Sequence, residues 1–367
     1  MQGNDNLGNY YPYQDQYQVQ NSNNDFSTVL SYKGNREITW ETSKSFNTGV
    51  EFEFFKNRLR GGVEYFSRVT EDMLYNRPVA PTIGYSSYPS NVGSMSNNGV
   101  EIELSGDVVR SKNVVWSLFL NATSFKNKIK ELSPELEGEL VSGSRIYREG
   151  ESMYQLNLYK YAGVDAETGE ATYFKDVLDD KGNVTEQTTT KTTADATRYA
   201  TGDILPSVYG GFGTTLSAYG FDLSATFAYQ LGGRILDYGY MYFMHAGGSS
   251  DVGQNWHKDI LNAWTPENTS SNIPRLNYYD QYANSLSDRF LVSSNYLSIN
   301  NITLGYTLPE KLVKKIGLSN IRVYGTIDNV AVFSTRQGLD PRQGYLGSAV
   351  DVYSPMRTVS GGVSFSF

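Results

Sequence analysis

The amino-acid sequence predicts an all-β fold, namely an antiparallel transmembrane β-barrel, and three observations support this. Apolar and polar side chains alternate in segment after segment, as in strands with one face toward lipid and the other toward a wet interior. The chain is polar on average, with a mean hydropathy of −0.44, yet it contains 29 Tyr, 17 Phe and 35 Gly. The links between the predicted strands are alternately short and long, like the periplasmic turns and extracellular loops of such barrels.

Composition also excludes several classes of protein and site. No apolar run approaches the roughly 18 residues of a membrane-spanning helix. A net charge of −8 without any basic stripe excludes nucleic acid as a partner. Cysteine is absent, and the only two histidines, His245 and His257, lie in one predicted loop without the spacing of metal ligands or of a catalytic triad. The sequence therefore predicts no catalytic residue, no metal site and no cofactor.

Residues 1–44 are predicted to be an extracellular loop and a segment that leads into the barrel. The chain begins with MQGNDNLGNYYPYQ, which has neither the basic region nor the apolar region of a signal peptide. A barrel protein of an outer membrane needs such a signal to be exported. We therefore expect that processing has removed it, or that this chain is the carboxyl-terminal piece of a longer protein.

Period-2 alternation recurs throughout the predicted barrel, residues 45–367. In VEFEFF (50–55) and VEIEL (100–104) glutamates alternate with apolar residues, and FDLSATFAYQ (221–230) and IRVYGTID (321–328) repeat the pattern. Paired glutamates could suggest glycoside hydrolysis, in which two carboxylates do the chemistry. Carboxylates at i and i+2 of one strand are better explained as the hydrated wall of a barrel, so an enzyme is not predicted.

About 11 strands are predicted, and their links determine the topology. The short links are KNR, SKN, DAETGE, YG and PEKLVKKIGLS, with long links between them. This order directs the last strand toward the periplasm, where Phe365 and Phe367 would form the aromatic terminus that outer-membrane barrels present for assembly. The predicted strands are 45–55, 59–74, 98–110, 114–132, 152–164, 171–177, 207–218, 221–237, 289–308, 320–335 and 358–367.

One predicted strand, YLSINNITLGYTL, changes phase along its length. Its apolar residues fall on odd numbers at Leu297 and Ile299, and on even numbers from Ile302 onward. A shift of one residue would turn the wrong side chains toward lipid unless the strand accommodates an extra residue. The sequence therefore predicts a β-bulge at Asn300 and Asn301.

Aromatic residues of the long link near 238–288 are the candidate ligand contacts. Sugar rings and peptide side chains both stack on flat apolar faces. Such residues also form the interfacial girdle of a barrel, pack a loop together or contact another protein, and these alternatives stay open. The candidates are Tyr238, Tyr240 and Tyr242 at i, i+2 spacing, together with Trp256, Trp264, Tyr278 and Tyr279.

Five blocks of the sequence, in order, resemble the carboxyl-terminal barrel of SusC/RagA-type TonB-dependent transporters. The resemblance extends from about Trp40 onward and implies a 22-stranded barrel, plugged by an amino-terminal domain, in the outer membrane of a Gram-negative bacterium of the Bacteroidetes type. About 11 strands would be half of that barrel. The blocks are NVGSMSNNGVEIEL, YAGVDAETGEATYF, GGFGTTLSAYGFDLSATFAYQLGGRILD, HKDILNAWTPENTSSNIPRL and SNYLSINNITLGYTLPEKLVKKIGLSNIRVYGTIDNVAVFS.

The same resemblance implies import of glycan or peptide oligomers with energy from the TonB complex, and a SusD-like surface lipoprotein as a lid. A separate amino-terminal piece would supply the plug, the TonB contact and the earlier strands, and outer-membrane lipid would surround the barrel. Two other hypotheses stay open. One is a non-transporting outer-membrane scaffold for surface lipoproteins, and the other is a soluble carbohydrate-binding β-sandwich.

Overall fold

The computed structural model describes residues 2–4, 7–22, 25–248, 253–344, 347–349 and 353–367. Strands dominate these ranges, so the predicted all-β fold is confirmed. The chain divides into two compact units. The first comprises residues 1–50, 63–101 and 125–155, and the second comprises residues 51–62, 102–124 and 156–367.

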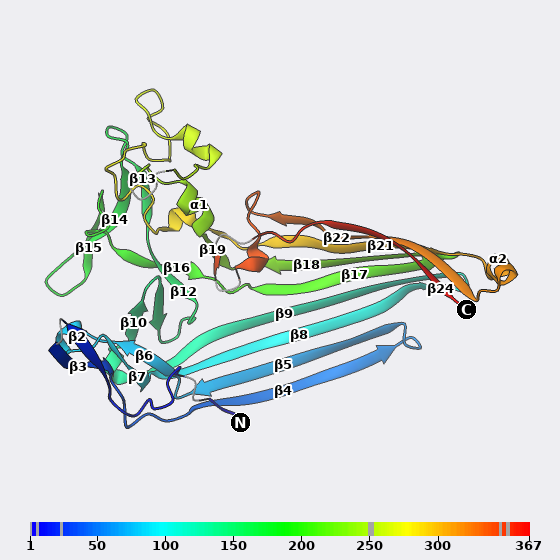
Figure 1. The fold of residues 1–367 in the computed structure, drawn as a ribbon, viewed down its shortest axis with the longest axis horizontal. Coiled ribbons are helices and arrows are strands. Elements are labelled where there is room, and N and C mark those ends of the chain that lie inside the picture. Colours follow the sequence, from blue (N-terminus) through cyan, green and yellow to red (C-terminus); the bar gives the residue numbers. More distant parts are fainter. Residues whose placement is uncertain (1, 5–6, 23–24, 249–252, 345–346, 350–352) are drawn as a thin grey trace. The chain divides into compact units, whose positions relative to one another are not determined.

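The largest sheet has ten strands, and their order in space follows their order in the chain (Figure 1). Every pairing described between its neighbours is antiparallel. This up-and-down arrangement is the one expected of the predicted barrel. In spatial order the strands are β1 (Gln2–Asn4), β4 (Glu41–Phe54), β5 (Leu59–Glu71), β8 (Gly93–Arg110), β9 (Val114–Leu132), β17 (Val208–Ala218), β18 (Phe221–Leu231), β21 (Tyr296–Thr307), β22 (Asn320–Ser334) and β24 (Thr358–Ser366).

The first unit adds short hairpins to its share of these strands. Two of them form separate two-stranded sheets, and a third follows β9. The predicted lead-in, residues 1–44, contains β1, the first of these hairpins and the start of β4. The elements are β2 (Gln16–Ser22), β3 (Asp25–Tyr32), β6 (Leu74–Pro78), η1 (Pro81–Ile83), β7 (Ser87–Asn91), η2 (Pro134–Leu136), β10 (Glu139–Ser142) and β11 (Arg145–Arg148).

The second unit carries most of the additional structure, chiefly in two long links of its strands. Throughout the described ranges, the helices are too short and too polar to cross a membrane. The elements are β12 (Gln155–Tyr159), β13 (Tyr161–Val164), β14 (Ala171–Leu178), β15 (Val184–Thr190), β16 (Arg198–Asp203), β19 (Arg234–Asp237), α1 (Tyr238–Phe243), η4 (Lys258–Asn262), η5 (Asp288–Phe290), β20 (Leu291–Ser293), α2 (Glu310–Val313), η6 (Lys314–Ile316), η7 (Pro341–Gln343) and β23 (Ser348–Ala349).

Two predicted barrel strands, 152–164 and 171–177, lie outside the ten-stranded sheet. The first is divided into β12 and β13, and the second is β14, the centre of a three-stranded sheet with β13 and β15. A barrel strand needs about 9–11 residues to cross the membrane, and β13 has only 4. Strand β9 instead pairs directly with β17. The assignment of residues 152–164 and 171–177 to the barrel was therefore wrong, and the link between β9 and β17 is one long loop.

The predicted bulge in β21 is confirmed. Ile299 lies opposite Phe227 and Asn301 opposite the adjacent Thr226, so Asn300 is the extra residue relative to β18. The Oγ of Ser298 donates a hydrogen bond of 2.6 Å to Oδ1 of Asn300. The bulge restores the phase, because the apolar side chains before and after it then lie on the same face of the sheet.

Strands β22 and β24 show the two faces of this sheet clearly. Opposing residues of antiparallel strands share a face, and on one face the opposing pairs are apolar. Val323, Val363, Val359 and Phe365 on this face are all exposed, which suits a face toward lipid. On the opposite face Arg322 lies opposite Ser364, and Thr326 opposite Ser360. The apolar pairs are Ile321 with Phe365, Val323 with Val363 and Ile327 with Val359.

Candidate functional site

The candidate site lies in the second unit, where the sheet of β13, β14 and β15 meets the segment between α1 and β20. At its centre is the turn between β13 and β14, which has the sequence DAETGE (165–170). Oδ1 of Asp165 accepts hydrogen bonds from the backbone N–H groups of Glu167 (3.0 Å) and Thr168 (2.9 Å). Gly169 has φ +74°, a conformation that side-chain-bearing residues rarely adopt. An aspartate that bonds its own turn and a glycine at positive φ explain why this sequence forms a tight turn.

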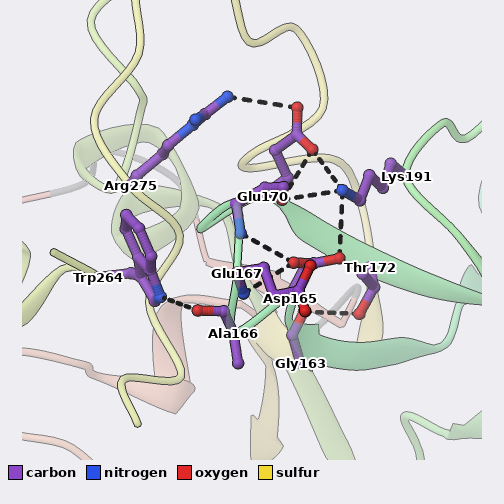
Figure 2. Close-up of polar contacts among 10 residues, drawn as sticks. Gly163, Asp165, Ala166, Glu167, Glu170, Thr172, Lys191, Trp264 and Arg275 are labelled. Carbon is purple, nitrogen blue, oxygen red and sulfur yellow. Dashed lines mark hydrogen bonds and ion pairs between the residues drawn. The ribbon is translucent and has the colours of Figure 1, made fainter. Parts of the chain in front are cut away.

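Charged side chains tie two other segments to this turn (Figure 2). The Nζ of Lys191, which follows β15, lies 2.7 Å from Oε2 of Glu170 and 3.1 Å from Oδ2 of Asp165. The other carboxylate oxygen of Glu170 accepts a hydrogen bond of 3.3 Å from Nη2 of Arg275. The network therefore joins the turn, the end of β15 and the segment around residue 275 by alternating charges.

The ionisation of this network follows from its contacts. The backbone N–H of Thr168 and the ammonium of Lys191 hold the pKa of Asp165 at about 2, below its ordinary value. Lys191 also lowers the pKa of Glu170, and the carboxylate of Glu170 in turn raises the pKa of Lys191. The ammonium of Lys191 thus lies between the two carboxylates and neutralises part of their charge. In the part of the chain that the structure describes, no three acidic or histidine side chains are grouped to hold a metal ion.

Trp264 packs against the same turn. Its Nε1 donates a hydrogen bond of 3.2 Å to the carbonyl oxygen of Ala166 (Figure 2). A Cβ on Gly169 would lie only 2.4 Å from the indole ring, so glycine is required here by the ring as well as by φ. The backbone N–H of Arg275 donates to the carbonyl of Gly169 at 2.8 Å. Among the roles predicted for the loop tryptophans, this geometry matches packing of the loop.

Tyr238, Tyr240 and Tyr242 lie on α1, so their i, i+2 spacing does not place them on one face as it would in a strand. Helix α1 begins after Asp237, whose carboxylate caps it by accepting the N–H of Tyr240 at 2.9 Å. The hydroxyl of Tyr240 donates to Asp259 at 2.9 Å, and burial raises its pKa to about 12. Tyr242, in contrast, is 48% exposed.

The remaining candidates differ in how much surface they expose. Trp256 stacks on His245 with ring centroids 4.9 Å apart, and its Nε1 donates to the backbone carbonyl of His245 at 3.0 Å, which leaves the indole 47% exposed. Tyr278 and Tyr279 lie edge to face, 5.1 Å between centroids, and are 52% and 83% exposed. Outward contacts are therefore available from Tyr242, Trp256, Tyr278 and Tyr279, whereas Tyr240 is bonded within the loop and Trp264 to the turn between β13 and β14.

Sequence reasoning missed the residues that anchor this loop. The guanidinium of the half-buried Arg289 lies 5.3 Å from the ring centroid of Tyr161, and its Nη1 donates to the carbonyl of Ala283 at 3.0 Å. Burial lowers the pKa of Arg289 and raises that of Tyr161 to about 12. The hydroxyl of Tyr173, a residue only 1% exposed, donates to the carbonyl of Tyr282 at 2.5 Å. No local pattern marks these contacts, because Tyr161 is more than 100 positions from Arg289 and Tyr282 is more than 100 positions from Tyr173.

Phe365 and Phe367, the predicted assembly terminus, lie at the end of the sheet strand β24. Their rings are 5.8 Å apart between centroids and are 57% and 90% exposed. The hydroxyl of Ser319 donates to the carbonyl oxygen of Phe367 at 3.2 Å. Their role in assembly stays a prediction.

Acidification is expected to loosen the turn that holds Trp264. A carboxylate whose pKa is lowered contributes stability above its ordinary range and loses it as the pH falls, here from about 4 toward about 2 for Asp165. The measurement is the emission spectrum of Trp264, taken as the difference between the wild type and Trp264→Phe, which should shift to the red over this interval. The transition should be smaller when Asp165 is replaced by Asn. If the Asp165→Asn variant showed the same transition as the protein that keeps Asp165, this carboxylate would be excluded as the cause.

Comparison with known proteins gives a consistent answer. Residues 3–148 match the family model described as TonB dependent receptor-like, beta-barrel. The chain is 28% identical over 92% of its length to TonB-dependent receptor P3 of Formosa agariphila, and 24% identical over 90% to TonB-dependent receptor SusC of Bacteroides thetaiotaomicron. It spans about a third of each relative, 35% and 32% respectively.

Solved structures agree with the sequence comparison. The structure of the RagAB peptide transporter matches the whole chain with a TM-score of 0.81 and 28% identity, while the chain covers 40% of that protein. The RagAB peptide importer in its open-open state matches with a TM-score of 0.80. These relatives are receptors and transporters rather than enzymes. The predicted resemblance to SusC/RagA-type proteins is confirmed, and the partial coverage is consistent with a carboxyl-terminal portion of such a barrel.

Proposed function

We propose that this chain is part of the β-barrel of a SusC/RagA-type TonB-dependent receptor of the outer membrane and that it serves in the import of nutrient oligomers. The observation that supports this most directly is the match of the entire chain to the RagAB peptide transporter at 28% identity. The ten-stranded up-and-down sheet, with its exposed apolar face, is the part of an importer that crosses the membrane.

The partners we propose follow from what a barrel of this kind needs to work. An amino-terminal piece would supply the plug and the strands that pair with the two edges of the sheet, because open edges are not tolerated in lipid. The TonB complex would act through that piece, and a SusD-like surface lipoprotein would cover the extracellular end. The cargo would be a glycan or peptide oligomer.

We propose the exposed aromatics of the 238–288 link as contacts for cargo or lid, with Tyr278 and Tyr279 the most accessible. Aromatic stacking contributes about 0.5–1.5 kcal/mol per ring, so Tyr278→Ala combined with Tyr279→Ala should weaken uptake or cargo affinity about tenfold. The control is Tyr219→Ala, which removes a tyrosine of similar exposure, 74%, from the short turn between β17 and β18. Equal uptake by both variants would show that these rings contact neither cargo nor lid.

Importer and scaffold can be separated by measuring uptake in the host bacterium. Cells lacking the protein, and complemented cells, would be supplied with labelled glycan or peptide oligomers, with and without a functional TonB complex. The importer predicts uptake that needs both the protein and TonB. Surface lipoproteins that stay attached in the absence of any TonB-dependent uptake would instead support the non-transporting scaffold.

A further inference from the structure

A pocket with a volume of about 510 Å³ lies at the end of β22 that precedes the long link to β24. It belongs wholly to the second unit and is separate from the network around Asp165 and Glu170. Its wall is formed by the last residues of β22, by the segment that follows, and by the residues just before β24. The side chains that matter for its chemistry are Arg336, Asp340, Arg342 and Arg357.

Two of its three arginines are held in fixed positions by carboxylates. Arg342 makes a fork with Asp340, with its Nε 2.8 Å from Oδ1 and its Nη2 2.7 Å from Oδ2, and Asp340 is buried. Nη2 of Arg336 pairs with the buried Asp237. The guanidinium of Arg336 also lies 4.2 Å from the ring centroid of Tyr240, which fixes its plane.

The third arginine leaves the pocket with positive charge. Nη2 of Arg357 donates a hydrogen bond of 2.6 Å to the carbonyl of Val330, and no described carboxylate is ion-paired with it. The Nε of Arg336 is buried and has no hydrogen-bond partner within the described ranges. Among the described residues, three guanidinium groups are thus opposed by two carboxylates, Asp237 and Asp340. This surplus is local, because the chain as a whole carries a net charge of −8.

We propose that this pocket binds an oxyanion, the carboxylate, sulfate or phosphate group of a ligand that enters it. Guanidinium groups present planar pairs of N–H donors that match such groups better than an ammonium does. Arg357 supplies the uncompensated charge, while Arg336 and Arg342 supply donors whose directions are already fixed by their aspartates. Ordering these side chains in advance reduces the entropy lost on binding.

Binding is tested directly with inorganic sulfate. The detergent-solubilised protein, in the form isolated from the membrane, would be dialysed to equilibrium against radiolabelled sulfate, with the ionic strength held constant by chloride. We expect one saturable site with a Kd of about 1 mM, as for a small ligand bound by a few charged contacts. Arg357→Gln should weaken it about tenfold, and Arg357→Lys should weaken it less because the charge is kept.

The matched control is Arg148→Gln, which removes an arginine that lies outside the pocket and pairs with Glu139 at 2.7 Å. Folding of each variant would be verified by the mobility of the unheated protein in a denaturing gel. The proposal is overturned if sulfate binding is not saturable, or if Arg357→Gln binds sulfate as tightly as Arg148→Gln does. This outcome does not depend on uptake, so failure of the pocket and failure of the importer are separate results.

The source of the oxyanion is distinguished by competition. Phosphate groups of lipid A and anionic groups of soluble oligomers share the required chemistry. Displacement of labelled sulfate by mixed micelles that contain lipid A would identify the lipid headgroup as the ligand. Displacement by a sulfated or carboxylated oligosaccharide, without an effect of lipid A, would instead assign the pocket to soluble anions. Both results retain the oxyanion site.

Discussion

Replacing Gly210 with Val is expected to prevent assembly of the barrel sheet. Gly210 lies in β17 opposite Ala122 of β9, and a Cβ built on it would lie 2.1 Å from the carbonyl oxygen of Asn121. The atom that it meets belongs to the backbone, so no side-chain rotation relieves the overlap. Strand β17 would have to move away from β9, which breaks the hydrogen bonds between them.

The measurement is the fraction of protein that keeps its folded, fast-migrating band in an unheated denaturing gel. A loss of several kcal/mol is a large part of the free energy of unfolding of a typical domain. We therefore expect the folded fraction of the variant to be roughly a tenth of the wild-type value or less. Gly325→Val is the control, because a Cβ at Gly325 in β22 would meet nothing closer than the carbonyl of Ser360 at 3.9 Å. Equal folded fractions for the two variants would contradict the close approach of β9 and β17.

The regular part of the sheet could be predicted from the sequence because its signals are local. The short links KNR, SKN and YG separate strands whose side chains alternate without a break, and at these links the strands end and begin within a residue of the predicted bounds. At their other ends the predictions are less accurate, because β8 begins at residue 93 rather than 98 and β18 ends at residue 231 rather than 237. The bulge at Asn300 was also predictable, because a change of phase within one strand has few structural solutions.

The region between β9 and β17 could not be predicted in the same way. DAETGE is a true hairpin turn, and the turn alone carries no information on whether its strands cross the membrane or extend a loop. Only the length of β13, 4 residues, and the direct pairing of β9 with β17 decide this. Both facts depend on contacts between residues that are far apart in the sequence.

In the candidate site, too, the local features could be predicted from the sequence, whereas the contacts between distant residues could not. The sequence identified aromatic residues on the right loop, but it could not separate the exposed Tyr279 from Trp264, whose indole bonds the carbonyl of Ala166 98 positions away. The charges that organise the loop were missed for the same reason. Lys191 and Arg275 are ordinary surface residues by composition, and only the fold brings both to Glu170.

Phe290→Ala is expected to open this loop while leaving the barrel sheet assembled. Phe290 is 1% exposed, and its ring lies edge to face with Tyr240, 6.2 Å between centroids, with the guanidinium of Arg289 5.0 Å away. Truncating a buried Phe costs about 3–5 kcal/mol, which raises the population of the open loop by a factor of about 10² to 10³ or more.

Native-state proteolysis measures that population, because cleavage follows the open form when closing is faster than cutting. We expect cleavage within residues 238–290 to accelerate by this factor, with fragments identified by mass and with the folded band of the barrel retained. Phe333→Ala removes the same ring from β22, where it is 58% exposed, and should leave the cleavage rate within about twofold of the wild type. Cleavage of Phe290→Ala at the wild-type rate would contradict a loop held by its apolar core and would favour the ion pair of Arg275 with Glu170 as its anchor.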